Sequence, residues 1–321
     1  MDDRSNGTIV ITGPLIGDHQ AHLPDTYEVV YSDRKVMEQM EFNEVVKSAC
    51  AAVVMTSLQV NQEVIDSAPK LKIISNFGVG YDNIDVEYAH QKEVLVTNTP
   101  DVLTTSCAEL ALALVMMTAR KMAEGHRLIE NGEFKGWKID LLLGCELRGK
   151  TFGIFGCGRI GQALSKIISG FGMRVIYHNR KKLSPETETE LDIHYVGYQE
   201  LISDSDILVI TASLNDQNRH SFELETFKQM KRDSILVNIG RGGVIKESDL
   251  VLALKEDLIG GVGLDVFENP AKIPKALRCN PRVTLTPHIG SATLEARSAM
   301  SALSIKAILD VINGLEPKYM L

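Results

Sequence analysis

Residues 151–161 read TFGIFGCGRIG, a pattern that identifies the type of fold. A short apolar run, TFGIF, is followed by Gly156, Gly158 and Gly161, and the third glycine lies inside an apolar helix pattern, IGQALSKIISG. Glycines between a strand and a helix let the backbone approach a pyrophosphate closely at the helix N-terminus. A plain tight turn is the alternative, but the flanking strand and helix patterns favour a dinucleotide-binding βαβ unit.

The alternation of strand and helix patterns continues on both sides of this stretch. Short β-branched runs separated by helix-length segments indicate parallel α/β sheets. The predicted strands are residues 8–12, 51–56, 71–75, 94–98, 151–156, 173–178, 206–211, 234–240, 261–267 and 283–288. This series predicts an α/β protein with two doubly wound parallel sheets.

Two helix patterns bear on how the domains are connected. One runs from about Leu103 to Glu130 and predicts a single long helix between the two strand series. The other runs from Ser291 to Asn313, ends at Gly314 and is too short to form a domain. We expect this last helix to pack on the first domain. The second domain, a Rossmann domain at residues 102–289, would then be inserted into a flavodoxin-like domain made of residues 1–101 and 290–321.

Composition excludes several classes of function. With 321 residues, 44% hydrophobic and 24% charged, the chain resembles an ordinary soluble protein of two domains. A net charge of -8 argues against a nucleic-acid or membrane surface. The N-terminus, MDDRSNGTIV, is acidic where a signal peptide is basic, and the apolar run near Leu110 is too short to span a bilayer. Five cysteines without a CxxC pair indicate reduced thiols in a cytoplasmic protein and no metal site.

The segment VIYHNRKK, residues 175–182, bears on which dinucleotide is bound. In this type of βαβ unit the second strand normally ends in an acid that bonds the ribose 2′-hydroxyl, but no carboxylate occurs between Met173 and Pro185. Arg180, Lys181 and Lys182 stand there instead, and a guanidinium can hold a 2′-phosphate through two parallel hydrogen bonds. The segment therefore predicts a preference for NADPH, with NADH possible, although a solvated basic turn is the alternative.

Several motifs, in a fixed order, resemble the D-isomer-specific 2-hydroxyacid dehydrogenase family. They are NFGVGYDNID (76–85), VTNTPDVLT (96–104), GCGRIG (156–161), VNIGRGGVI (237–245), GLDVF (263–267) and TPHIGSAT (286–293). The resemblance covers nearly the whole chain and is strongest to the glyoxylate and hydroxypyruvate reductases. It implies that the discontinuous domain binds substrate and that the inserted domain binds the coenzyme.

The resemblance also implies roles for individual residues. Arg241 would bind the substrate carboxylate and polarise the 2-oxo group, and His288 would protonate the carbonyl oxygen. The N–H groups of Val79 and Gly80 would complete the carboxylate pocket. Coenzyme contacts would come from Thr104, Gly156, Gly158, Arg159, Ile160, Gly161, Asn179, Arg180, Lys181, Ser213, Ile239, Gly240, Asp265 and Gly290. Without the resemblance, each of these residues has an ordinary structural reading, such as a surface ion pair for Arg241.

The chain departs from the family pattern at one catalytic position. The family has two variable residues after Asp-Val-Phe and then a catalytic glutamate, whereas LDVFENPAKIP places Pro270 there. Glu268 is the nearest carboxylate, and we expect it either to turn inward and pair with His288 or to face solvent. An unpaired His288 would lack the usual upward push on its pKa.

The leading interpretation is an NADPH-dependent reductase of small 2-oxo acids such as glyoxylate and hydroxypyruvate. A dehydrogenase of a longer 2-hydroxy acid and a dinucleotide-sensing binding protein on the same scaffold are the alternatives. The resemblance further implies a homodimer, with the region around Trp137 forming a contact between subunits.

Overall fold

The computed structural model describes residues 6–321, so Asp2 and Asp3, two acids of the N-terminal stretch, lie outside the described residues. The chain forms two compact units. Unit 1 contains the chain up to Leu103 together with Ser291–Leu321, and unit 2 is Thr104–Gly290.

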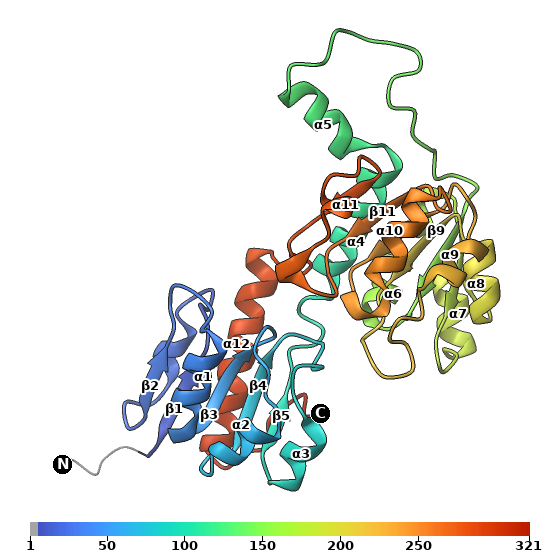
Figure 1. Cartoon of the computed structure of the whole chain (residues 1–321). Coiled ribbons are helices and arrows are strands. Elements are labelled where there is room, and N and C mark those ends of the chain that lie inside the picture. The colour runs from blue at the N-terminus through green and yellow to red at the C-terminus, as the bar shows by residue number, and fades with distance from the viewer. Residues whose placement is uncertain (1–5) are drawn as a thin grey trace. The chain divides into compact units, whose positions relative to one another are not determined.

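Unit 1 is a parallel five-stranded sheet with the order β2-β1-β3-β4-β5, the flavodoxin-like order. Its strands are β1 (Thr8–Ile11), β2 (Glu28–Tyr31), β3 (Ala49–Met55), β4 (Ile73–Phe77) and β5 (Leu95–Thr97). Its helices are α1 (Gln39–Val45), α2 (Gln62–Ser67), α3 (Val86–Gln91), α12 (Leu294–Ile312) and the 3-10 turns η1 (His19–His22) and η2 (Val46–Ser48). Although distant in sequence, α12 packs against β3 and β4 (Figure 1).

Unit 2 is a parallel seven-stranded sheet with the order β12-β11-β10-β9-β6-β7-β8, which is the Rossmann order with one added strand. Its strands are β6 (Thr151–Phe155), β7 (Arg174–His178), β8 (Ile193–Tyr195), β9 (Ile207–Ile210), β10 (Ile235–Asn238), β11 (Gly261–Leu264) and β12 (Val283–Leu285). Its α-helices are α4 (Thr104–Ala119), α5 (Met122–Glu130), α6 (Arg159–Ile168), α7 (Pro185–Leu191), α8 (Tyr198–Asp204), α9 (Leu224–Gln229), α10 (Glu247–Lys255) and α11 (Lys275–Arg278). Short 3-10 turns are η3 (Ser169–Phe171), η4 (Gly242–Val244) and η5 (Pro270–Lys272).

The two sheets confirm the predicted fold class of two doubly wound α/β domains. Central strands such as β3, β9 and β10 are buried along their whole length, because helices cover both faces of a parallel sheet. The sequence analysis missed β2 and β8, which lie at sheet edges and are short and partly exposed.

The single long helix expected from Leu103 to Glu130 is wrong, because the structure has two helices there. Helix α4 ends at Ala119, and α5 begins at Met122. Between them Lys121 adopts a left-handed backbone with φ +52°, and the N–H of Cys145 bonds the carbonyl of Ala119 at 2.9 Å. Helix α4 therefore ends at Ala119, although the apolar pattern of the sequence continues beyond this residue.

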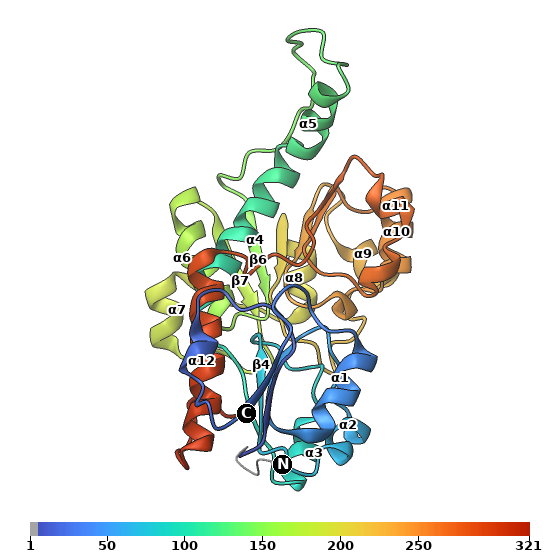
Figure 2. The same cartoon turned by 90° about the vertical axis from the view of Figure 1, so that its left-hand side faces the viewer.

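Helix α5 and the loop after it extend away from the sheet of unit 2 in both views (Figures 1 and 2). No helix within residues 6–321 is both long enough and apolar enough to cross a bilayer.

Candidate active site

The glycine loop that joins β6 to α6 has the geometry of a dinucleotide-binding turn. Gly156 has φ +92°, and a side chain there would lie 2.5 Å from the Cα of Ala212. A side chain on Gly161 would lie 3.1 Å from Ile154, so this glycine lets α6 pack close to the sheet. Around Gly158 there is open space instead, which leaves room for a pyrophosphate at the N-terminus of α6.

A cavity of about 680 Å³ lies beside this loop, at the carboxyl ends of β6, β7 and β9. The strand order reverses between β6 and β9, and ligands of such sheets bind at this switch point. The cavity brings together six of the expected coenzyme residues, namely Gly156, Gly158, Asn179, Arg180, Lys181 and Ser213. None of the described residues that line it has a carboxylate.

The three cations of the basic turn do not share one environment. Arg180 and Lys181 line the cavity, whereas Lys182 Nζ lies 3.2 Å from Glu188 Oε2. Burial pushes the pKa of Glu188 upward, but hydrogen bonds from Tyr177 and Lys182 outweigh it and lower the pKa below its ordinary value. Lys182 therefore neutralises a carboxylate outside the cavity, and the positive charge within it comes from Arg180 and Lys181.

Cys157, inside the glycine loop, is fully buried, and burial raises its pKa to about 12. Its carbonyl accepts a hydrogen bond of 3.1 Å from Asn179 Nδ2, which ties the end of β7 to the glycine loop. The thiol is therefore a neutral, small packing group.

Sequence reasoning missed part of the cavity wall. His178 lines it with its ring stacked on Phe155 at an interplanar angle of 11° and with Nδ1 2.9 Å from the carbonyl oxygen of Val196. Other residues missed are Tyr198, Thr211, Ala212, Asn215, Gln217, Asn218 and Ser221. The polar run ASLNDQN directly after β9 was the available signal, because carboxyl-end loops of such sheets form binding sites.

A buried carboxylate organises the turn that contains His288. Asp265, 1% exposed, accepts hydrogen bonds at Oδ1 from Thr286 Oγ1 (2.7 Å) and from Ile289 N (2.8 Å). Its Oδ2 accepts from Gly290 N at 2.9 Å, and its backbone carbonyl accepts from His288 N at 2.9 Å. His288 itself is exposed with φ +54°, so these bonds hold a strained backbone in place.

The Arg241 loop is fixed by close backbone packing. Asn238 Nδ2 donates to the carbonyl of Arg241 at 2.9 Å, and an arginine N–H donates to the carbonyl of Gly240 at 3.1 Å. A side chain on Gly242 would lie 1.9 Å from the backbone of Phe267, so this position requires glycine. Arg241, Asp265 and His288 thus follow β10, β11 and β12, three neighbouring strands at one sheet edge.

The Glu268 carboxylate does not turn inward to pair with His288, which was one of its two expected orientations. Its Oε1 lies 2.6 Å from His220 Nε2, and its Oε2 accepts from Glu247 N at 3.3 Å. The N–H of Glu268 in turn donates to Glu247 Oε1 at 2.6 Å. Pro270 begins the short turn η5, where its missing N–H is tolerated, and it offers no side-chain acid.

The remaining predicted residues of unit 2 lie in three places. Thr104 begins α4, while Arg159, Ile160 and Gly161 form the first turn of α6 next to the cavity. A side chain on Gly240 would lie 2.4 Å from the carbonyl of Ala212, and Ile239 N donates to Ile210 O at 3.1 Å, so both lie where β10 meets β9.

In unit 1, Val79 and Gly80 lie in the turn after β4. Their carbonyls accept side-chain amide hydrogen bonds from Asn98 (2.9 Å) and Asn76 (2.8 Å), respectively. Within residues 6–321 their N–H groups donate no hydrogen bond to the protein.

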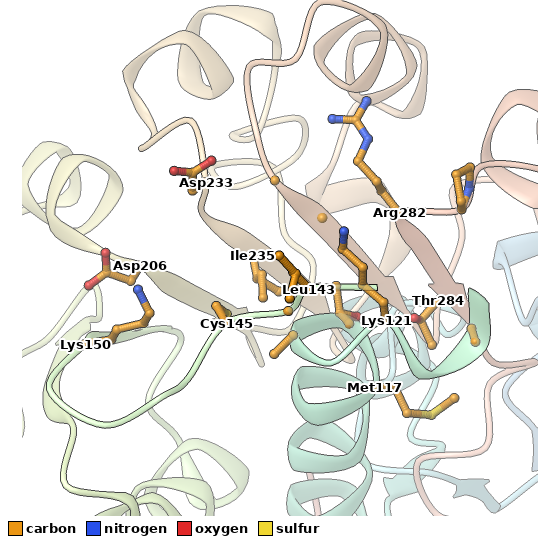
Figure 3. Close-up of a pocket in the computed structure, with 17 residues that line it drawn as sticks. Met117, Lys121, Leu143, Cys145, Lys150, Asp206, Asp233, Ile235, Arg282 and Thr284 are labelled. Atoms are coloured by element: carbon orange, nitrogen blue, oxygen red, sulfur yellow. The ribbon is translucent and has the colours of Figure 1, made fainter. Parts of the chain in front are cut away.

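A second cavity, of about 380 Å³, lies at the opposite, amino-terminal edge of the unit 2 sheet (Figure 3). Its charged residues are Lys121, Lys150, Asp206, Asp233 and Arg282. Two of these charges are paired with residues outside the cavity lining, since Asp206 bonds Lys231 at 2.9 Å and Arg282 bonds Asp257 at 2.9 Å. Among residues 6–321 no group of three or more His, Cys, Asp or Glu is arranged to hold a metal ion.

The profile of the D-isomer-specific 2-hydroxyacid dehydrogenase family, NAD-binding domain, matches residues 112–290. The chain belongs to this dehydrogenase family. A glyoxylate reductase of Pyrococcus horikoshii is 42% identical over 300 residues, which are 92% of this chain and 90% of that protein. This 2-hydroxyacid dehydrogenase is therefore an NAD(P)-dependent oxidoreductase.

Solved structures of similar proteins match the dehydrogenase over almost its whole length. A protein of Thermus thermophilus has a TM-score of 0.90 and 34% identity, covering 98% of this chain and 99% of its own. An NADPH-dependent glyoxylate/hydroxypyruvate reductase of Sinorhizobium meliloti, in complex with NADP and malonate, has a TM-score of 0.86 and 30% identity, covering 99% and 97%.

Proposed function

We propose that the protein reduces small 2-oxo acids, such as glyoxylate and hydroxypyruvate, to D-2-hydroxy acids with NADPH. The observation that carries this proposal is the edge of the unit 2 sheet, where Arg241, Asp265 and His288 follow three neighbouring strands. The glyoxylate reductases among its relatives support the small substrate.

The chemistry assigned to the residues follows from their side chains. Arg241 binds the substrate carboxylate and polarises the 2-oxo group, a task suited to a planar cation with several donors. His288 donates a proton to the carbonyl oxygen, which requires a group that titrates near neutrality. The N–H groups of Val79 and Gly80 are assigned to the same carboxylate. The glycine loop and the cavity beside it would hold the coenzyme, which when bound would supply a hydride for the carbonyl carbon.

A panel of 2-oxo acids with NADPH tests this function. Glyoxylate and hydroxypyruvate should be the best substrates, and Arg241→Ala should lower kcat/KM by at least about a hundredfold. A clear preference for aryl pyruvates or sugar acids would instead support a dehydrogenase of longer acids. Tight NADPH binding without any turnover would support a dinucleotide-sensing protein, and unimpaired reduction by Arg241→Ala would overturn the role of the arginine.

The preference for NADPH is part of the proposal and is supported by Arg180 and Lys181 in a cavity without carboxylates among its described lining residues. Arg180→Ser combined with Lys181→Ser should reduce kcat/KM for NADPH by at least about tenfold and leave that for NADH within about twofold. Lys182→Ser is the matched control, because Lys182 is paired with Glu188. Equal losses with both coenzymes would contradict a contact to the 2′-phosphate.

We further propose a cytoplasmic homodimer. The free state of all five cysteines supports a reducing compartment. The exposed apolar side chains on α5 and the loop after it support a second subunit.

A further inference from the structure

The turn from Gly78 to Tyr81 in unit 1 has three consecutive carbonyls that are all held by hydrogen bonds. Thr99 N donates to Gly78 O at 3.1 Å. Asn98 Nδ2 donates to Val79 O at 2.9 Å, and Asn76 Nδ2 donates to Gly80 O at 2.8 Å. The donors come from the end of β4 and from the segment directly after β5.

Holding these carbonyls fixes the direction of the N–H groups that follow them. In a planar trans peptide the C=O and the next N–H point in opposite directions. The N–H groups of Val79, Gly80 and Tyr81 therefore point away from the three donors. Within residues 6–321 none of these N–H groups donates a hydrogen bond to the protein. Successive unpaired N–H groups of this kind form a concave binding site for an anion.

The amide of Asn76 is itself held in orientation. It is fully buried, and its Oδ1 accepts a hydrogen bond of 3.2 Å from Asn83 Nδ2, which also bonds Leu58 O at 3.0 Å. Asn76 must therefore present its NH₂ group to Gly80. The turn also has no space for a side chain at Gly78, where a Cβ would lie 2.6 Å from Thr56 Cγ2.

We propose that Asn98 and Asn76 are positioning residues that hold the three N–H groups preformed for the carboxylate of the 2-oxo acid. This inference rests on the proposed function for the identity of the anion. Because the donors are oriented before binding, the substrate does not have to order them.

Asn98→Leu tests the proposal, since leucine has a similar shape but no donor. The variant should raise KM for glyoxylate about fivefold and leave KM for NADPH unchanged. Methyl glyoxylate, which lacks the anionic oxygen, should be reduced by the variant as well as by the wild-type protein. Asn98→Asp should raise KM for glyoxylate further, because its charge repels both the Val79 carbonyl and the substrate.

Asn61→Asp is the control in the same unit. Asn61 Oδ1 accepts from Val64 N at 3.1 Å to cap α2, and aspartate caps equally well. Its kinetics should match those of the wild type. A loss of folded protein would lower the apparent kcat for the acid and the ester alike, whereas a loss of positioning would raise KM for the acid alone, so comparing the two substrates separates the two effects.

Binding of malonate, measured by calorimetry with NADPH present, runs in parallel and does not depend on turnover. The proposed function alone would be overturned if the wild-type protein binds malonate but reduces no 2-oxo acid. The positioning role would still stand in that case if Asn98→Leu weakens malonate binding about fivefold. The positioning role alone would be overturned by a different result. In that result the wild-type protein reduces glyoxylate, and Asn98→Leu leaves both the KM for glyoxylate and the binding of malonate unchanged.

Discussion

Glu268 and Pro270 lie in the segment where the family pattern has its catalytic glutamate, and neither supplies a carboxylate to His288. Glu268 is the carboxylate nearest to Pro270 in the sequence, and it forms hydrogen bonds with His220 and with the N–H of Glu247. Its side chain thus connects the loop after β11 to the loop after β9. The Arg241 loop packs at Gly242 against the backbone of Phe267 and Glu268.

The pH profile of Glu268→Gln tests this arrangement. If Glu268 were the partner of His288, the variant would lower the apparent pKa of the basic limb of glyoxylate reduction. Because Glu268 is bonded to His220, we expect that limb to stay where it is and kcat/KM to fall by about threefold through a looser Arg241 loop. His220→Gln should behave in the same way, and a shifted basic limb in Glu268→Gln alone would restore the direct pairing.

Glu247, at the start of α10, gives unit 2 a predictable dependence of stability on pH. Burial raises its pKa, the nearby charge of Glu268 raises it further, and the hydrogen bond from Glu268 N opposes both. A carboxyl with a raised pKa in the folded state binds its proton more tightly there than in the unfolded chain. Its stabilising contribution is therefore complete below its ordinary pKa of 4.5 and is lost as the pH rises through the raised value.

Glu247→Gln should remove this loss, because glutamine keeps the acceptor for Glu268 N but never ionises. Urea denaturation should give equal midpoints for variant and wild type at about pH 4 and a higher midpoint for the variant at about pH 8. Glu200→Gln, an exposed substitution in the first turn of α8, serves as the control. A variant less stable than the wild type at the higher pH would contradict the assigned pKa direction.

At the scale of elements, the break between α4 and α5 depends on one residue in an unfavourable conformation. Lys121 has φ +52°, which costs about 1–2 kcal/mol for a residue with a Cβ but nothing for glycine. Lys121→Gly should therefore stabilise unit 2 by about 0.5–1 kcal/mol in thermal or urea unfolding. Lys121→Ala keeps the Cβ and should show no gain; equal effects of the two variants would mean that the conformation is not strained.

This break also shows what the sequence could and could not predict about the elements. The hydrophobic pattern continues through residues 119–122, so periodicity alone predicts one helix. The end of α4 is set by Cys145, which is far along the chain from Ala119 and bonds its carbonyl. Buried central strands were predictable because their apolar runs are continuous, whereas the edge strands β2 and β8 have no such signal.

The candidate site was predictable to a similar degree. The glycine loop, Arg241, Asp265 and His288 follow apolar strands directly, so their place at the sheet edge could be inferred from the sequence. The partner of Glu268 could not be inferred from the sequence, because His220 is 48 residues away and the contact between the two side chains depends on the conformations of two loops. The separation of Lys182 from Arg180 and Lys181 likewise depends on Glu188 in the following helix.

At the scale of the whole molecule, the apolar side chains on α5 and the loop after it are unusually exposed. Trp137 is 81% exposed and Ile139 is 79% exposed. Large apolar side chains with this exposure are typical of an interface, and the proposed second subunit would cover them.

Trp137→Ser combined with Ile139→Ser should shift the protein from dimer to monomer in sedimentation velocity experiments. Met40→Ser is the matched control, because Met40 is 83% exposed but lies in unit 1. A double variant that sediments like the wild type would place the interface elsewhere.

The insertion of unit 2 into unit 1 has a consequence for biosynthesis. The ribosome completes residues 104–290 as one continuous stretch, so the sheet of unit 2 can form as soon as Gly290 has emerged. The first sheet, although made earlier, lacks the helix α12 that packs on β3 and β4 until the residues after unit 2 have been translated. A premature stop between unit 2 and α12 would therefore leave β3 and β4 of unit 1 without their covering helix, and these exposed strands would be expected to bind chaperones.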